Sequence, residues 1–215
     1  MKHIYLIRHG RQSSKLCNVD VDLDKAGKEQ AKHLAKRLRG YDIHRLYCSG
    51  LKRAVQTADI IGKELGLSPE QVMDFKEIDF GDLTGLDDET VAEKYADFRR
   101  ERAKMDRDLP YPGGESGEDV IRRVYPELRK ICEEPGERIA IVTHGGVIRA
   151  LCAHLLQTDL KNKLRISIDL ENTSITEIIF KEEAKEFYVE RVNDYAHLEN
   201  HPELLRSGWK SSLIR

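Results

Sequence analysis

A chain of 215 residues is long enough for one α/β domain with a sizeable core. It has 36 lysines and arginines against 38 aspartates and glutamates, so its formal net charge is −2 and the two signs are interleaved. This balance argues against a surface that binds nucleic acid or an anionic membrane in bulk. No apolar run approaches membrane-spanning length, and no signal-like core follows the N-terminus. Because the charges are balanced over the whole chain, any anion-binding site must come from a local cluster of basic side chains.

The four cysteines are scattered and form no CxxC pair. Cys48 and Cys152 lie inside apolar patterns, which indicates buried thiols in a reducing compartment. The chain has no internal repeat and no low-complexity linker. We therefore expect a single domain over residues 1–215, located in the cytoplasm.

The chain opens with a short apolar run at residues 4–7, which is typical of a buried strand in an α/β sheet. This run ends at Arg8-His9-Gly10. An arginine and a histidine are thereby placed at the C-terminal end of a strand, where open α/β sheets bind ligands. Gly10 allows a sharp exit and lets a ligand approach the backbone closely.

A helix and a second strand follow. Asp24 is a good N-cap for a helix with an apolar stripe, and residues 44–48 have the pattern of a short strand. Ser49 can cap the next helix. Arg53 then lies in the first turn of that helix, just past the end of a strand and on the same side of the sheet as His9.

The middle of the chain is less regular. Residues 72–78 have the pattern of a third strand that runs out at Glu77. Residues 87–108 are highly charged and weakly periodic, so we expect exposed helices there. One interpretation of this segment is a solvated face, slightly favoured by composition, and the other is a lid insertion near residues 87–117 over the sheet edge.

The second half repeats the strand-to-histidine arrangement. Residues 138–142 form a buried strand pattern that ends at Thr143-His144-Gly145, and a helix pattern follows. His144 thus precedes a helix N-terminus, where free backbone N–H groups favour an anion. Two β runs at 174–180 and 186–192 come next, and the last twenty residues show no clear period. The alternation predicts a doubly wound, three-layer α/β/α fold with a mostly parallel central sheet.

Four basic side chains, Arg8, His9, Arg53 and His144, therefore converge with one carboxylate, Glu77. Such a cluster would repel itself unless a polyanion neutralises it, and phosphate suits the two-pronged grip of arginine. Like charges lower the pKa of a histidine, so a neutral imidazole is available to attack phosphorus. Glu77 is the acid placed to protonate the leaving alcohol and later to activate water.

The main competing interpretation is a metal site on His9 and His144. The neighbouring arginines would repel a cation, and the carboxylate ligands typical of such sites are missing. The sequence also lacks a GxSxG elbow, a P-loop and a GxGxxG fingerprint.

Together these segments resemble the histidine phosphatases, the superfamily that includes the cofactor-dependent phosphoglycerate mutases. The resemblance extends over most of the chain, in the family's order. Its elements are Arg8-His9-Gly10, residues 23–31 (LDKAGKEQA), the S-x-x-x-R-A-x-Q-T-A segment at 49–58, Glu77 four residues before Gly81, residues 112–116, Thr143-His144-Gly145 and Asn172-Thr173-Ser174.

The resemblance implies that His9 is the nucleophile, with no metal and no cofactor. Arg8, Arg53 and His144 would complete the phosphate pocket, and Glu77 would be the general acid. We expect substrate contacts from Gly10, Arg11, Ser13 and Gly145, while the arginines at 99, 100 and 102 are further candidates for contacting the non-phosphate part of a substrate.

The chain also departs from the family pattern. After Gly10 the family often has Glu-Ser or Glu-Thr followed shortly by Trp-Asn, whereas this chain reads Arg11-Gln12-Ser13-Ser14 and Asn18 comes too late to align. Gln12 and the lack of a His-Asp dipeptide exclude the acid phosphatase and phytase branch. The longer central insertion of the mutases finds no match in residues 87–108, which favours a phosphatase over a mutase.

We therefore expect a metal-independent phosphomonoester hydrolase that acts through a phosphohistidine at His9. Its substrate would be a small phosphorylated metabolite or a phosphoprotein. The alternatives are phosphoryl transfer of the phosphoglycerate mutase type and a non-catalytic regulator that binds a phosphorylated ligand. Binding alone requires neither His9 nor Glu77, and this argues against the regulator.

Overall fold

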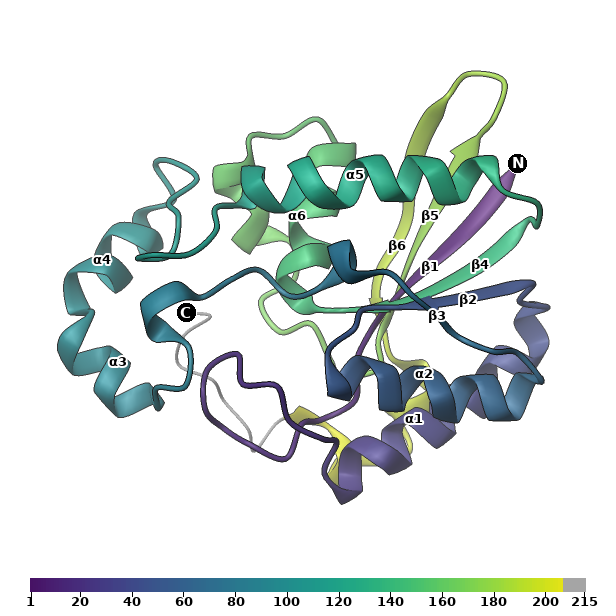
Figure 1. The fold of residues 1–215 in the computed structure, drawn as a ribbon, viewed down its shortest axis with the longest axis horizontal. Helices are drawn as coiled ribbons and strands as arrows, with labels where there is room; N and C mark the ends of the chain where they lie inside the picture. The colour runs from purple at the N-terminus through teal and green to yellow at the C-terminus, as the bar shows by residue number, and fades with distance from the viewer. Residues whose placement is uncertain (207–215) are drawn as a thin grey trace.

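The computed structural model describes residues 1–206 (Figure 1). One six-stranded sheet has the order β3-β2-β4-β1-β5-β6. The neighbouring pairs among β1 to β4 are parallel, and β5 pairs antiparallel with both β1 and β6. The strands are β1 (Lys2–Arg8), β2 (Arg45–Cys48), β3 (Glu70–Gln71), β4 (Arg138–Thr143), β5 (Ile175–Lys181) and β6 (Glu186–Asp194).

Helices cover both faces of this sheet. Figure 1 shows α1 and α2 on one face and α5 and α6 on the other, which confirms the predicted three-layer fold with a mostly parallel sheet. The α-helices are α1 (Lys25–Leu38), α2 (Lys52–Leu65), α3 (Asp88–Lys94), α4 (Ala96–Lys104), α5 (Gly117–Glu133) and α6 (Gly145–Leu155). The 3₁₀ helices are η1 (Arg39–Tyr41), η2 (Met73–Phe75), η3 (Gly81–Leu83), η4 (Leu160–Arg165), η5 (Ala196–Leu198) and η6 (Pro202–Leu204).

The first strand is apolar throughout because it is buried on both faces. Ile4 and Leu6 pack in the hydrophobic cluster beneath α5 and α6, whereas Tyr5 and Ile7 pack in the cluster beneath α1 and α2. A strand that lies between two helical layers has no solvent-facing side, so its sequence does not alternate. The N-terminal run thereby holds Arg8 and the residues after it at the centre of the sheet edge.

The predicted strand at residues 72–78 is wrong. Only the two residues of β3 pair with β2, and the chain then forms the 3₁₀ helix η2. Phe75 is fully buried, and its carbonyl accepts a hydrogen bond of 2.8 Å from the Thr143 hydroxyl at the end of β4. The apolar pattern of this segment reflects burial across the end of the sheet. An apolar pattern alone does not distinguish such a buried segment from a strand that pairs within the sheet.

The helix starts were predicted with mixed success. The carboxylate of Asp24 caps α1 as expected and accepts a hydrogen bond of 2.6 Å from the amide of Gly27. Ser49 is not the N-cap of α2, because the helix begins at Lys52 with Leu51 in the cap position. The Ser49 hydroxyl instead contacts His144.

The four cysteines are buried free thiols, which confirms the prediction made for Cys48 and Cys152. Within residues 1–206, no helix has both the length and the apolar character needed to cross a membrane.

Helix α1 lies directly against the loop that follows β1. A Cβ atom added to Gly27 would lie 2.1 Å from the carbonyl oxygen of Arg11, whereas a Cβ atom at Gly40 would meet nothing within 4 Å. We predict that Gly27→Ala lowers the free energy of unfolding by about 1–3 kcal/mol in spite of the better helix propensity of alanine. Urea unfolding measures this effect, with Gly40→Ala as the matched control. Equal stability of the two variants would contradict the close approach.

Candidate active site

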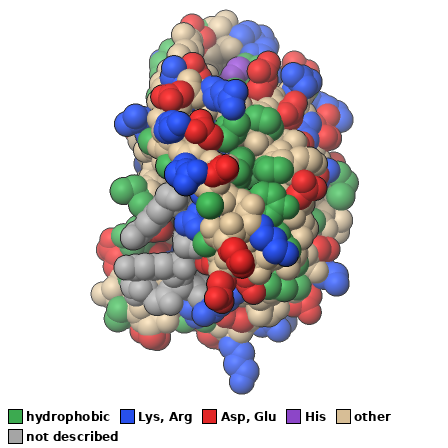
Figure 2. All heavy atoms as spheres, turned by 90° about the vertical axis from the view of Figure 1, so that its left-hand side faces the viewer, with side chains coloured by type: hydrophobic (Ala, Val, Ile, Leu, Met, Phe, Trp, Pro, Cys, Tyr) green, Lys and Arg blue, Asp and Glu red, His purple; other side chains and the backbone are tan. Residues whose placement is uncertain are grey.

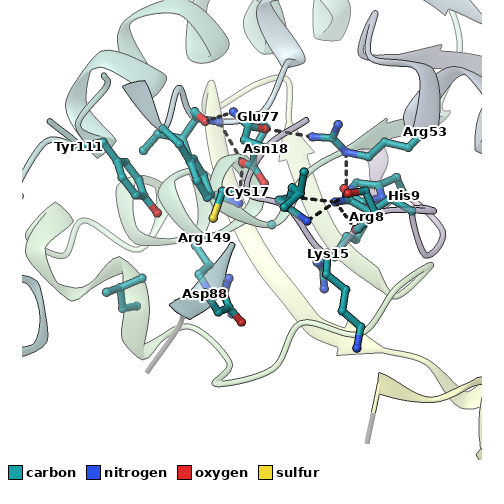
Figure 3. Close-up of a pocket in the computed structure, with 18 of the residues that line it drawn as sticks. Arg8, His9, Lys15, Cys17, Asn18, Arg53, Glu77, Asp88, Tyr111 and Arg149 are labelled. Carbon is teal, nitrogen blue, oxygen red and sulfur yellow. Dashed lines mark hydrogen bonds between the residues drawn. The ribbon is translucent and has the colours of Figure 1, made fainter. Parts of the chain in front are cut away.

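A pocket of about 200 Å³ opens where the parallel strands end (Figure 3). Among the described residues that line it, seven are lysine or arginine and two are acidic. Figure 2 views the molecule from the side on which α3 and α4 lie, and basic and acidic side chains are interspersed over that face. The pocket lining, unlike this face, has an excess of positive charge, as a local anion site requires.

His9 lies at the inner end of the pocket and is 5% exposed. Its Nδ1 is 2.7 Å from the carbonyl oxygen of Gly10. A carbonyl can only accept, so Nδ1 carries the proton and Nε2 holds the free electron pair. The Nε of Arg53 donates to this Nε2 at 3.3 Å (Figure 3). The atom that can act as a nucleophile thus faces an arginine.

The surroundings keep both histidines of the site neutral. Burial is the largest cause that holds the pKa of His9 well below its ordinary value, and the charges of Arg53 and Arg8 add to it. The pKa of His144 is lowered in the same direction by burial, Arg53 and His9. This agrees with the prediction from like charges, although removal from water is the larger effect.

Arg53 is 2% exposed and is held by loop groups. Its Nη1 donates to the carbonyl of Val19 at 2.9 Å, and its Nη2 donates to Oδ1 of Asn18 at 3.2 Å. No carboxylate forms an ion pair with Arg53 within residues 1–206. Asn18 also donates to the carbonyl of Ile78 at 3.2 Å. Asn18 does not align with the family's Trp-Asn pattern, but the structure brings it to the pocket wall.

Arg8 enters the pocket from the end of β1. Its Nη1 donates to the carbonyl of Leu170, and its buried Nε has no hydrogen-bond partner among residues 1–206. Burial and the nearby charges of Arg206 and Arg149 lower its pKa. A guanidinium in this environment gains from any anion that enters the pocket.

His144 packs behind His9, with 5.0 Å between the ring centroids. It is fully buried at the N-cap position of α6, and its Nε2 is 2.7 Å from the Ser49 hydroxyl. The pocket wall at this point consists of Gly145 and Gly146 rather than of the His144 ring. The N-terminus of α6 therefore reaches the pocket.

Glu77 approaches the same helix end. Its Oε1 accepts hydrogen bonds of 2.9 Å from the amides of Ile78 and Gly146, which leaves Oε2 available to hold a proton. A Cβ atom at Gly146 would lie 2.5 Å from this Oε1. Glycine at 146 is thus a requirement for placing Glu77, which the sequence analysis missed although the Gly-Gly pair after His144 was a visible signal.

Only some of the residues predicted to contact the substrate lie in the pocket wall. Gly145 lines the pocket, but Gly10, Arg11 and Ser13 are not among its lining residues. Arg11 forms an ion pair with Asp24 instead, with 3.0 Å between Nε and Oδ2. The same loop reaches the pocket through Gln12, Ser14 and Lys15.

Part of the pocket wall is aromatic. Phe80 and Tyr111 stack with 4.4 Å between ring centroids, and the guanidinium of Arg102 lies 4.4 Å from the Tyr111 centroid. Of the arginines at 99, 100 and 102, only Arg102 lines the pocket. Arg102 belongs to α4, and Asp88 of α3 is also in the wall.

These features define a cationic pocket of an α/β fold, in which a buried histidine faces arginines at the carboxyl ends of parallel strands. The histidine phosphatase superfamily (branch 1) matches residues 4–195, and the chain belongs to this family. Its relatives and structural neighbours include phosphatases of the histidine phosphatase type, and the chain is an enzyme of this type.

Three similar proteins illustrate the range of the family. Phosphoglycerate mutase-like protein 4 of Arabidopsis thaliana is 38% identical over 160 residues, which are 69% of this chain and 68% of that protein. Uncharacterized phosphatase PhoE of Bacillus subtilis (strain 168) is 31% identical over 201 residues, which are 91% of this chain and 94% of that protein. The structure of mycobacterial glucosyl-3-phosphoglycerate phosphatase with inorganic phosphate has a TM-score of 0.81 and 25% identity, and the match covers 92% of this chain and 99% of that chain.

Proposed function

We propose that this enzyme hydrolyses phosphomonoesters without a metal ion, through a phosphohistidine on Nε2 of His9. The observation that carries the proposal is the hydrogen bond of 2.7 Å between Nδ1 of His9 and the Gly10 carbonyl. It fixes the tautomer with the electron pair on Nε2, at the inner end of a cationic pocket. Neutral imidazole is a competent nucleophile toward phosphorus.

In the first step, Nε2 forms a bond to phosphorus while the bond from phosphorus to the leaving oxygen breaks. The leaving oxygen takes a proton from Oε2 of Glu77. Arg8 and Arg53 stabilise the charge on the non-bridging oxygens during the transfer, while His144 packs against the His9 ring and helps to position it. These groups are already held by protein atoms, so little reorganisation is needed in the transition state.

In the second step, water attacks the phosphohistidine. The carboxylate of Glu77 accepts a proton from this water, inorganic phosphate leaves, and both residues return to their starting states. The same carboxyl group therefore serves as acid and then as base. Its two amide donors, from Ile78 and Gly146, support a fixed position through both steps.

The charges of the pocket support a reaction without a metal ion. Within the described part of the chain, no three His, Cys, Asp or Glu side chains are grouped so that they could hold a metal. Arginines supply the positive charge that a divalent cation provides in other phosphoryl-transfer sites, and they would repel such a cation.

We propose a small phosphorylated metabolite as the substrate, and this is favoured over a phosphoprotein. The pocket encloses about 200 Å³, and its nucleophile is 5% exposed at the inner end. The related mycobacterial enzyme is named for a small phosphorylated compound. Asp88 and Arg102 bring α3 and α4 into the pocket wall, and this supports the lid interpretation of residues 87–117 over a solvated face.

We predict that His9→Ala abolishes turnover of nitrophenyl phosphate while the protein remains folded. Mass spectrometry of acid-labile phosphopeptides should place a phosphoryl group on the wild-type peptide that contains His9, and activity should persist in a chelator. Turnover at the wild-type rate in His9→Ala would contradict the covalent mechanism. Transfer of the phosphoryl group to phosphoglycerate in preference to water would indicate a mutase, and phosphate binding without turnover would indicate a regulator.

We predict that Glu77→Gln slows the phosphorylation of His9 by alkyl phosphates about 10²–10⁴-fold, the usual range for lost general acid catalysis. The loss with nitrophenyl phosphate should be much smaller, because the phenolate leaves without a proton. First-turnover burst rates for both esters measure the difference.

Asp79→Asn is the matched control for Glu77→Gln. Asp79 is exposed, lies outside the pocket wall and accepts a hydrogen bond of 2.9 Å from the amide of Gly81. An alkyl-selective loss in Asp79→Asn, or equal losses for both esters in Glu77→Gln, would move the acid away from Glu77.

A further inference from the structure

The C-terminal segment after β6 returns to the active site. It passes through η5 and η6 and ends, within the described residues, at Arg206. Arg206 is 6% exposed and lines the same pocket as His9. The sequence analysis assigned nothing to this segment, because it has no period and no motif.

One buried glutamine ties the segment to the loop after β1. The side chain of Gln30, on α1, is fully buried. Its Oε1 accepts a hydrogen bond of 2.8 Å from the amide of Arg11, and its Nε2 donates to the carbonyl of Leu204 at 2.7 Å. The chain leaving the nucleophile and the chain approaching Arg206 are therefore positioned by the same side chain.

Two further contacts fix Arg206 itself. Its amide donates to Oε2 of Glu171 at 3.1 Å, and its Nη1 donates to the carbonyl of Leu170 at 3.1 Å. The carbonyl of Leu170 also accepts from Nη1 of Arg8. Two guanidinium groups that share one carbonyl oxygen must lie side by side, so Arg206 stands next to the phosphate arginine of β1.

This arrangement is electrostatically costly in the free enzyme. Arg206 lies close enough to contribute to the lowered pKa of both Arg8 and His9. Glu171 offsets part of this charge. Burying two guanidinium groups on one carbonyl is unfavourable unless a further anion shares them. The buried Nε of Arg8, which has no partner within residues 1–206, is a donor that such an anion could use.

We propose that Arg206 is a third arginine of the phosphoryl-binding site, contributed by the C-terminal segment and acting beside Arg8. The proposal rests on the proposed function, because it concerns the phosphoryl group that His9 receives. The shared Leu170 carbonyl places Arg206 at the phosphoryl end of the pocket.

The test uses inorganic phosphate, which has no leaving group. We expect Arg206→Met to weaken phosphate binding, measured by titration calorimetry, about tenfold to a hundredfold, as for the loss of hydrogen bonds to a charged group. kcat/KM for nitrophenyl phosphate should fall by a similar factor, and Arg206→Lys should recover part of both. Arg165→Met is the matched control, since Arg165 is exposed and lies outside the pocket wall, and it should bind phosphate like the wild type.

Urea unfolding without phosphate separates binding from a structural role. We expect Arg206→Met to be at least as stable as the wild type in that experiment, because the variant no longer buries two neighbouring charges. It should also lose most of the stabilisation that phosphate gives the wild type. Wild-type phosphate affinity in Arg206→Met would overturn the inference, as would a loss of stability without phosphate that Arg206→Lys fails to restore. Neither result would affect the proposed function, which depends on whether His9→Ala is inactive.

Discussion

The burial of positive charge around a neutral histidine is the constraint on which the site depends. Arg53 is 2% exposed and is held by a carbonyl and an amide oxygen rather than by a carboxylate. Arg8 is held by another carbonyl, and its Nε has no partner in the described part of the chain. Charges buried in this way keep His9 unprotonated, and they leave positive charge in the pocket that a bound anion would neutralise. A phosphoryl group satisfies both conditions, since it supplies the negative charge and accepts the nucleophile.

The fold maintains this arrangement through close backbone contacts. The carbonyl of His9 accepts from the side chain of Asn172 at 2.9 Å, and the amide of Gly10 donates to the Thr57 hydroxyl at 3.0 Å. Gly27 lets α1 approach the loop after β1, and Gly146 lets Glu77 approach α6. Elements that are distant in the sequence thus fix His9 and Glu77 independently, and preorganised catalysis by these residues would require such rigidity.

Much of this site could be predicted from the sequence, because parallel strands place their carboxyl ends at one edge of a sheet. Arg8 ends β1 and His144 follows β4, and these two strands pair directly. The apolar runs of the sequence indicate both strands. Asn18 and Arg206 were missed for a different reason. Asn18 has a φ of 45° in an aperiodic loop, and Arg206 follows a segment without a pattern, so only tertiary contacts bring them to the pocket. Arg11 was predicted to contact the substrate, because the sequence does not show that its side chain forms an ion pair with Asp24.

The most direct test is the titration of the His9 imidazole, followed by NMR in the wild type and in Arg53→Met. The neutral ring is favoured by burial and by the charges of the arginines, so we expect the wild-type pKa to lie well below the ordinary value of 6.5. Removal of the Arg53 charge should raise it, and bound inorganic phosphate should raise it in the wild type, because an anion favours imidazolium. A wild-type pKa near 6.5 that neither Arg53→Met nor phosphate changes would contradict the central role of buried positive charge.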